Sequence, residues 1–188
     1  MAVKKNSGLQ YVICVSGASE TGHCALGAVE KAQEIGREIA RQGFVLVTGA
    51  TTGMPYWAAK GAKEAGGTVI GFSPAASKLS HQRTYHLPID YHDIIVYTGF
   101  GYSGRNLLLT RASDAVILIC GRMGTLNEFT IAFEDQKPIG VLEGTGGTAD
   151  IIEDLIVKSY RGPGKIAYDS EPAGLLKKVA QLIKEEEI

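Results

Sequence analysis

The chain has 188 residues, of which 45% are hydrophobic and 21% charged, and its formal net charge is −1. This length suits one globular domain, so we expect a single domain over residues 1–188. The charge balance offers no basic stripe for nucleic acid, and no apolar run approaches the roughly 20 residues that span a bilayer. Residues 1–10 are polar, which argues against a signal peptide and predicts a cytoplasmic protein.

The cysteines give no sign of a metal centre. There are three, Cys14, Cys24 and Cys120, and their spacing matches no zinc-binding pattern. Two of them lie in or at the end of apolar segments. We therefore expect buried, reduced thiols and no bound metal.

Short apolar segments alternate with longer helical patterns along the chain. The expected strands are residues 11–16, 44–48, 68–72, 93–98, 115–120 and 138–142. The expected helices are residues 23–42, 55–65, 106–113, 126–135, 149–158 and 173–187. Most strand segments are continuously apolar, which is typical of parallel strands covered on both faces. The alternation predicts right-handed βαβ units in a Rossmann-like, doubly wound, mainly parallel sheet with three α/β/α layers. Residues 73–91 are irregular, and an irregular segment of that length is usually a functional loop or a lid.

Glycine is the compositional outlier, with 24 residues that cluster after the apolar segments. In a doubly wound sheet, ligands bind beyond the carboxyl ends of the strands, so these turns mark the expected site. The first turn holds Ser16 and Gly17, where glycine permits a close backbone approach to a ligand. The alternative is a plain strand-to-helix turn.

The turn after the second expected strand precedes a helix that opens with proline. Its candidate ligand-binding residues are Gly49, Thr51, Gly53 and Met54. Pro55 suits a first helical turn, and the free amides at a helix N-terminus can hold an anion. A lone G-x-x-x-G spacing is weak evidence by itself, and its position after a strand strengthens it.

The last two turns carry charged residues. Gly104 and Arg105 lie in a glycine-rich segment after the fourth strand, and arginine is the preferred planar partner of phosphate or carboxylate. The alternative there is a surface arginine beside a flexible loop. After the fifth strand, Thr125 and Glu128 have the spacing of a capping box, yet a carboxylate near an anion-binding helix end also suits an active site. The candidate site residues of this turn are Gly121, Arg122, Met123, Gly124, Thr125 and Glu128.

Together these motifs resemble the Lonely Guy (LOG) family, formerly misannotated as lysine decarboxylases. The turn from Gly121 to Glu128 is similar to the family's P-G-G-x-G-T-x-x-E motif, and residues 48–54 are similar to its G-G-G-x-x-G-L-M turn. Arg105, followed by Ser-Asp-Ala at residues 113–115, resembles its arginine signature. The resemblance spans roughly residues 10–160 and is closer to the branch of DprA/Smf-related and molybdenum cofactor carrier proteins.

The resemblance implies a nucleoside 5′-monophosphate phosphoribohydrolase with Arg105 and Glu128 as the catalytic pair. A carboxylate near C1′ can stabilise the oxocarbenium-like sugar, and Gly124 and Thr125 at the helix N-terminus would hold the 5′-phosphate. It implies no required cofactor and a homodimer or homotetramer. Arg122 stands where the motif has its second glycine, and at a position with positive φ or close to phosphate only glycine is free of strain.

The alternative function is a non-catalytic carrier or sensor of a nucleotide or a molybdopterin-type cofactor in the same cleft. In both cases the expected partner is a small phosphorylated ligand, with no nucleic acid and no membrane. A nicotinamide dehydrogenase is disfavoured, because the first turn lacks G-x-G-x-x-G and the second strand does not end in an acidic residue.

Overall fold

The computed structural model describes residues 9–185 and contains one parallel sheet with strand order β4-β3-β2-β1-β5-β6-β7. The strands are β1 (Val12–Gly17), β2 (Val45–Thr48), β3 (Val69–Ser73), β4 (Ile94–Tyr97), β5 (Ala115–Ile119), β6 (Ile139–Leu142) and β7 (Ile166–Asp169). Most of residues 1–10, on which the expectation about a signal peptide rests, lies outside the described residues, as does the end of the helix expected over 173–187.

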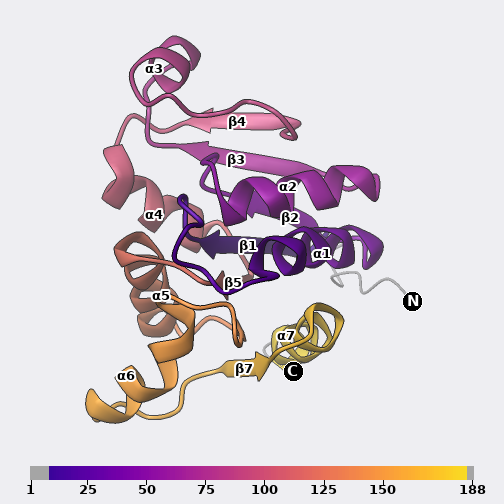
Figure 1. Ribbon diagram of the computed structural model, residues 1–188, viewed down its shortest axis with the longest axis vertical. Coiled ribbons are helices and arrows are strands. Elements are labelled where there is room, and N and C mark those ends of the chain that lie inside the picture. Colours follow the sequence, from indigo (N-terminus) through magenta and orange to yellow (C-terminus); the bar gives the residue numbers. More distant parts are fainter. Residues whose placement is uncertain (1–8, 186–188) are drawn as a thin grey trace.

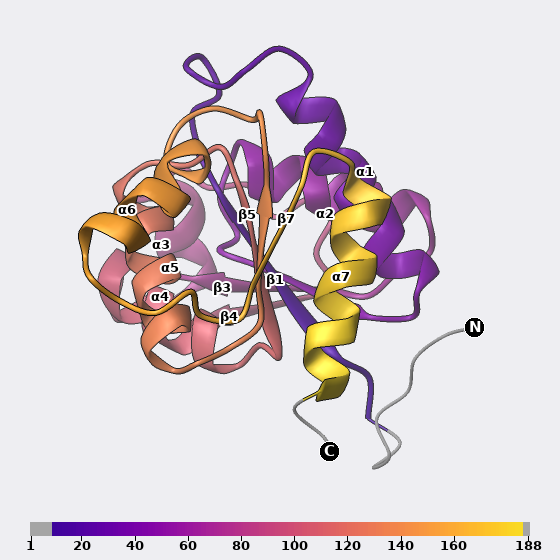
Figure 2. The same ribbon diagram turned by 90° about the horizontal axis from the view of Figure 1, so that it is seen from below.

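Helices cover both faces of the sheet, as Figures 1 and 2 show. One face carries α1 (Ala28–Arg41), α2 (Met54–Glu64) and α7 (Pro172–Glu185); the other carries α4 (Gly101–Arg111), α5 (Met123–Glu134) and α6 (Ile152–Lys158), which follows a short 3₁₀ turn, η1 (Ala149–Ile151). A small helix, α3 (Lys78–Arg83), lies beyond the β3–β4 edge. The three-layer α/β/α architecture is therefore confirmed. None of the described helices is both long and apolar enough to cross a membrane.

The centre of the sheet is buried because helices cover both of its faces. All five residues of β5 are buried, and β1 pairs with it in parallel from Ile13 opposite Ala115 to Gly17 opposite Ile119. The chain leaves β1 for β2 on one side and later returns to β5 on the other. This reversal of strand order opens a crevice at the carboxyl ends of β1 and β5, which is the usual ligand position in such folds.

The predicted elements differ from the observed ones mainly at their ends. All six expected strands are present, each shifted or trimmed by one or two residues. The helices α4 and α5 begin earlier than expected, at Gly101 and Met123, because the glycines in their first turns mask the helical pattern. The helix expected from residue 23 begins only at Ala28, after Gly27 in a left-handed conformation with φ 81°. Strand β7 and helix α3 were not predicted.

Candidate ligand-binding site

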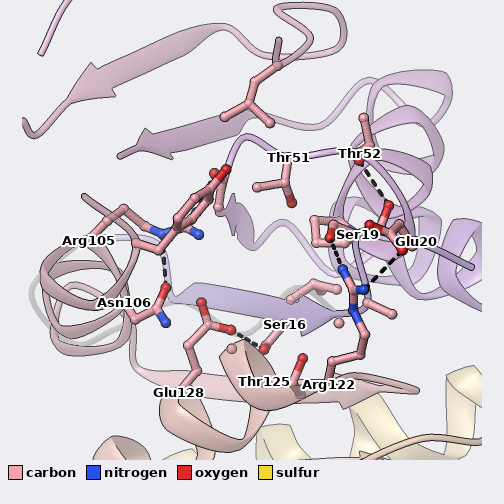
Figure 3. A pocket seen from close by; sticks show the side chains of 18 of the residues that line it. Ser16, Ser19, Glu20, Thr51, Thr52, Arg105, Asn106, Arg122, Thr125 and Glu128 are labelled. Atoms are coloured by element: carbon pink, nitrogen blue, oxygen red, sulfur yellow. Dashed lines mark hydrogen bonds and ion pairs between the residues drawn. The ribbon is translucent and has the colours of Figure 1, made fainter. Parts of the chain in front are cut away.

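A cavity of about 520 Å³ opens at the carboxyl edge of the sheet, where the turns after β1, β2 and β5 meet the first turn of α4 (Figure 3). The structure brings most of the expected site residues to this one cavity. Those that line it are Ser16, Gly17, Gly49, Thr51, Arg105, Arg122, Gly124, Thr125 and Glu128.

Five expected residues do not line the cavity: Gly53, Met54, Gly104, Gly121 and Met123. Met54 is fully buried in the core beneath the first turn, whereas the Met123 residue is 77% exposed. Gly53 adopts φ 73°, and a Cβ there would fall 2.1 Å from the carbonyl oxygen of a neighbouring loop. These residues shape the turns that form the cavity wall and do not face its interior.

Glu128 places a buried carboxylate in the cavity wall. It is 7% exposed and accepts a hydrogen bond from the Ser16 hydroxyl. Burial raises the pKa of Glu128, while the Arg105 charge and the Ser16 hydrogen bond oppose that rise. The capping-box alternative is wrong, because α5 already begins at Met123 and Glu128 lies in its second turn.

Arg105 also lies in the cavity wall and is 5% exposed. Its Nη1 donates to the Gly49 and Phe72 carbonyl oxygens, the latter at 3.1 Å, and its Nε donates to Asn106 Oδ1 at 3.0 Å. Burial lowers the pKa of Arg105, and the nearby Glu128 charge opposes this; an arginine nevertheless stays protonated in proteins. Within residues 9–185 no group accepts from Nη2, so this donor is available to a ligand.

Arg105 and Glu128 therefore line the same cavity, and each perturbs the pKa of the other through its charge. Among the described residues they form no direct ion pair. A ligand in this cavity therefore meets both a buried cation and a buried carboxyl group (Figure 3).

The rim of the cavity carries a second cation. Arg122 donates from Nη1 to Glu20 at 3.0 Å and from Nη2 to the Ser19 hydroxyl at 2.9 Å (Figure 3). Its backbone is extended, with φ −136° and ψ −155°, so this position does not require glycine. The arginine replaces the motif glycine without backbone strain and leaves the space before Gly124 and Thr125 open. These two residues belong to the first turn of α5, whose amides lack helical partners and favour an anion.

The segment expected to be irregular contributes a wall to the same cavity. Tyr85, His86 and Leu87 line it, and the Tyr85 ring contacts that of Tyr102 with centroids 5.6 Å apart. Behind them, the buried His81 hydrogen-bonds the Ser73 hydroxyl at 2.8 Å and the Pro88 carbonyl at 2.9 Å. The segment is thus anchored to the end of β3.

The expectation of three reduced cysteines is wrong for two of them. Cys24 and Cys120 form a disulfide, with their Cα atoms 5.7 Å apart, while Cys14 is free and buried. The two partners are separated by 96 residues. Only the folding of the β1–α1 loop over the end of β5 brings them together, so no local spacing could have indicated the pair.

Sequence reasoning also missed several lining residues. They are Ala18, Ser19, Glu20, Thr52, Pro55, Tyr85, His86, Leu87, Tyr102 and Asn106. Most are direct neighbours of residues that were expected, so widening each turn by two or three positions would have found them. Residues 85–87 lie in the segment that was expected to be a functional loop or a lid, but they were not among the candidate site residues.

The fold and the cavity together define a Rossmann-like protein with a ligand-binding role at the topological switch point. Residues 10–176 match the model of the SLOG cluster4 family, and the chain belongs to this family. The resemblance to the LOG-like superfamily is thereby confirmed.

Three similar proteins extend this result. An uncharacterized protein of Archaeoglobus fulgidus is 32% identical over 127 residues, which cover 68% of this chain and 78% of that protein. The molybdenum cofactor carrier protein of Chlamydomonas reinhardtii is 28% identical with a TM-score of 0.75, covering 94% of this chain and 99% of that one. The molybdenum cofactor binding protein of Rippkaea orientalis is 29% identical with a TM-score of 0.73, covering 96% and 99%.

Proposed function

We propose that the cavity binds a phosphorylated, nucleotide-sized heterocycle, and that a molybdopterin-type cofactor is the first candidate. The observation that carries this proposal is the pairing of a buried cation, Arg105, with a buried carboxylate, Glu128, on the walls of one cavity. The volume of about 520 Å³ lies within the range of roughly 300–1,000 Å³ that is usual for small-molecule sites. The similarity to two proteins that carry or bind the molybdenum cofactor supports the choice of ligand.

The donors around the cavity fit the two ends of such a ligand. The free amides of the first turn of α5, at Gly124 and Thr125, would hold the phosphate, with Arg122 at the rim as a second cation. Glu128 would accept hydrogen bonds from the N–H groups at the edge of the heterocycle, since an ionised carboxylate is an acceptor only. Arg105 would complete the site through its free Nη2.

A co-elution experiment tests this proposal. Cofactor released from a molybdoenzyme is incubated with the protein, the mixture is passed through a desalting column, and retained pterin is measured by fluorescence after oxidation. Inorganic phosphate and AMP serve as competitors. We expect about one pterin per chain and competition by AMP. If the protein retains no more pterin than Gly124→Leu, a variant whose leucine side chain fills the cavity, the proposal is refuted.

Two pairs of variants locate the binding. A Cβ on Gly124 meets no atom within 4 Å, and the same holds for Gly162 far from the cavity. Gly124→Leu therefore fills the cavity, whereas Gly162→Leu is its matched control. Arg122 and Arg161 are similarly exposed, at 45% and 54%, and each pairs with a glutamate at 3.0 Å. Arg122→Ala should weaken retention, while Arg161→Ala should leave it unchanged.

A second candidate function is hydrolysis of nucleoside 5′-monophosphates. It is favoured by Glu128, whose raised pKa suits a group that gives a proton to the leaving base as the N-glycosidic bond breaks. The water that attacks C1′ then returns a proton to the Glu128 carboxylate. Incubation with AMP and related monophosphates, followed by chromatography for free base, tests it. Turnover that equals that of Glu128→Gln would exclude this candidate and leave the binding proposal standing.

We also infer that the chain self-associates. The edge strand β4 exposes Ile94 and Val96, and the start of α4 exposes Phe100 and Tyr102. Exposed apolar patches of this kind often mark interaction surfaces. Sedimentation should show a dimer or tetramer, and Val96→Lys together with Phe100→Lys should shift it to monomer.

A further inference from the structure

A second cluster of chemically active side chains lies outside the lining of the cavity and includes the disulfide. It consists of His23, Cys24 and Cys120, whose donor atoms all lie within 4.8 Å of one another. The His23 Nε2 atom is 3.5 Å from Cys120 Sγ. Cys120 is buried, Cys24 is half-buried and His23 is exposed, so the cluster is open to solvent from the histidine side.

We propose that these three residues form a redox-controlled binding site for a thiophilic cation such as Zn²⁺, available when the disulfide is reduced. Two thiolates and one imidazole are ligands that zinc prefers, and three protein ligands leave the fourth tetrahedral position open. The site is distinct from the ligand cavity and does not depend on the function proposed for it.

The spacing of the donors fits a zinc ion. With Zn–S of about 2.3 Å and Zn–N of about 2.0–2.1 Å, a tetrahedral site separates its nitrogen and sulfur ligands by about 3.5 Å. The Nε2–Sγ distance of 3.5 Å already equals that value. The two sulfurs must separate to about 3.8 Å in the same geometry. Rotation about the Cα–Cβ bonds provides this separation while the Cα atoms stay 5.7 Å apart.

The backbone keeps the two cysteines close without the disulfide. Both sides are tied to Thr145: the Cys120 amide donates to its Oγ1 at 2.8 Å, and the Ala25 amide donates to its carbonyl oxygen at 3.0 Å. Reduction breaks the S–S bond but leaves these two hydrogen bonds in place. The ligands are therefore preorganised, which lowers the entropy cost of binding a metal.

Reduction of the disulfide turns both sulfurs into metal ligands. A dithiol reductant gives two electrons and two protons to the disulfide and becomes a disulfide itself, leaving Cys24 and Cys120 as thiols. Zn²⁺ then binds both sulfurs as thiolates, and the two thiol protons pass to solvent. In the oxidised cluster neither sulfur can become a thiolate, so the metal has no site there.

Zinc titration of the two redox states tests the proposal. The whole chain is reduced with a phosphine, desalted without oxygen and titrated with Zn²⁺ against a chromophoric chelator. A parallel titration with Co²⁺ records thiolate-to-metal charge-transfer absorption. We expect one ion per reduced chain and none per oxidised chain. Equal binding by the two states, or no binding by the reduced state, would overturn the proposal without any variant.

Variants then identify the ligands. Cys24→Ser and Cys120→Ser should abolish the charge-transfer band. His23→Ala should weaken Zn²⁺ binding at least about tenfold, since even the loss of an outer-shell partner typically costs 10–100-fold. Cys14→Ala is the matched control, because it removes the one other thiol, which is buried and free. If the control loses the ion and Cys24→Ser keeps it, the assignment is wrong.

Discussion

The Ser16 hydroxyl, near the end of β1, donates a hydrogen bond to the Glu128 carboxylate in α5, across 112 residues of sequence. Both side chains are buried. This contact couples the first turn of the sheet to the helix whose N-terminus faces the cavity. Among the described residues, two carboxylates line the cavity, those of Glu20 and Glu128, and only Glu128 is buried. The hydrogen bond therefore fixes one oxygen of this buried carboxylate.

Replacing Ser16 with alanine should raise the pKa of Glu128 further. The hydroxyl is one of two influences that lower this pKa against the effect of burial, the other being the Arg105 charge. Carbon-13 NMR of the labelled glutamate side chain, followed through a pH titration, measures the change. Ser19→Ala, at the rim, is the control and should leave the Glu128 titration unchanged. An unchanged titration in Ser16→Ala would show that the hydrogen bond does not stabilise the ionised form.

The stability of the protein should carry a pH dependence that Glu128→Gln removes. Because burial raises the folded-state pKa of Glu128 above the usual value of 4.5, the folded state holds this proton more tightly than the unfolded state. The stability that protonated Glu128 contributes is fully present below pH 4.5 and is lost as the pH rises through its folded-state pKa. Urea unfolding of both proteins at several pH values measures the difference. Each pKa unit corresponds to about 1.4 kcal/mol. If the free energy of unfolding changes with pH in the same way in both proteins, the prediction is wrong.

Gly49→Ala should disturb the Arg105 guanidinium directly. A Cβ at this position would lie 1.9 Å from Nη1, which is too close for any real contact. Because Arg105 is buried, it cannot move without losing hydrogen bonds, and a lost bond to a charged group costs about 1.5–3 kcal/mol. We expect a lower free energy of unfolding and weaker binding of the cavity ligand. Gly162→Ala, with no atom near its Cβ, should stay within about 0.5 kcal/mol of the parent protein. Equal stability of the two variants would mean that Arg105 has room to relax.

Reduction of the Cys24–Cys120 disulfide should destabilise the fold. The bond closes a loop with a sequence separation of 96, and in the chain-entropy model such a cross-link is worth about 4–5 kcal/mol. Calorimetry with and without a phosphine measures the fall in Tm. Cys24→Ala should start from the lower Tm and show no further response to the reductant. A reductant effect of the same size in Cys24→Ala would assign the loss to another cause.

Much of the fold was readable from the sequence because its determinants are local. Continuous apolar segments such as 115–120 indicated buried parallel strands, and the helical patterns between them indicated right-handed crossovers. The exceptions are β7, whose four residues Ile166–Asp169 do not form a continuous apolar segment, and the six-residue helix α3 (Lys78–Arg83). The start of α5 was misplaced because Gly124 weakens the helical pattern.

The glycine-rich turns also predicted where the cavity lies, since strands of a parallel sheet end at a common edge. The contacts within it were decided by the tertiary structure alone. The hydrogen bond from Arg105 to Gly49 and the disulfide from Cys24 to Cys120 each join loops that lie far apart in the chain. The extended backbone of Arg122 shapes the turn after β5. Local preferences determine which segments become strands and helices. Which side chains meet depends on how the finished layers bring distant loops together, and that information is not contained in any short stretch of residues.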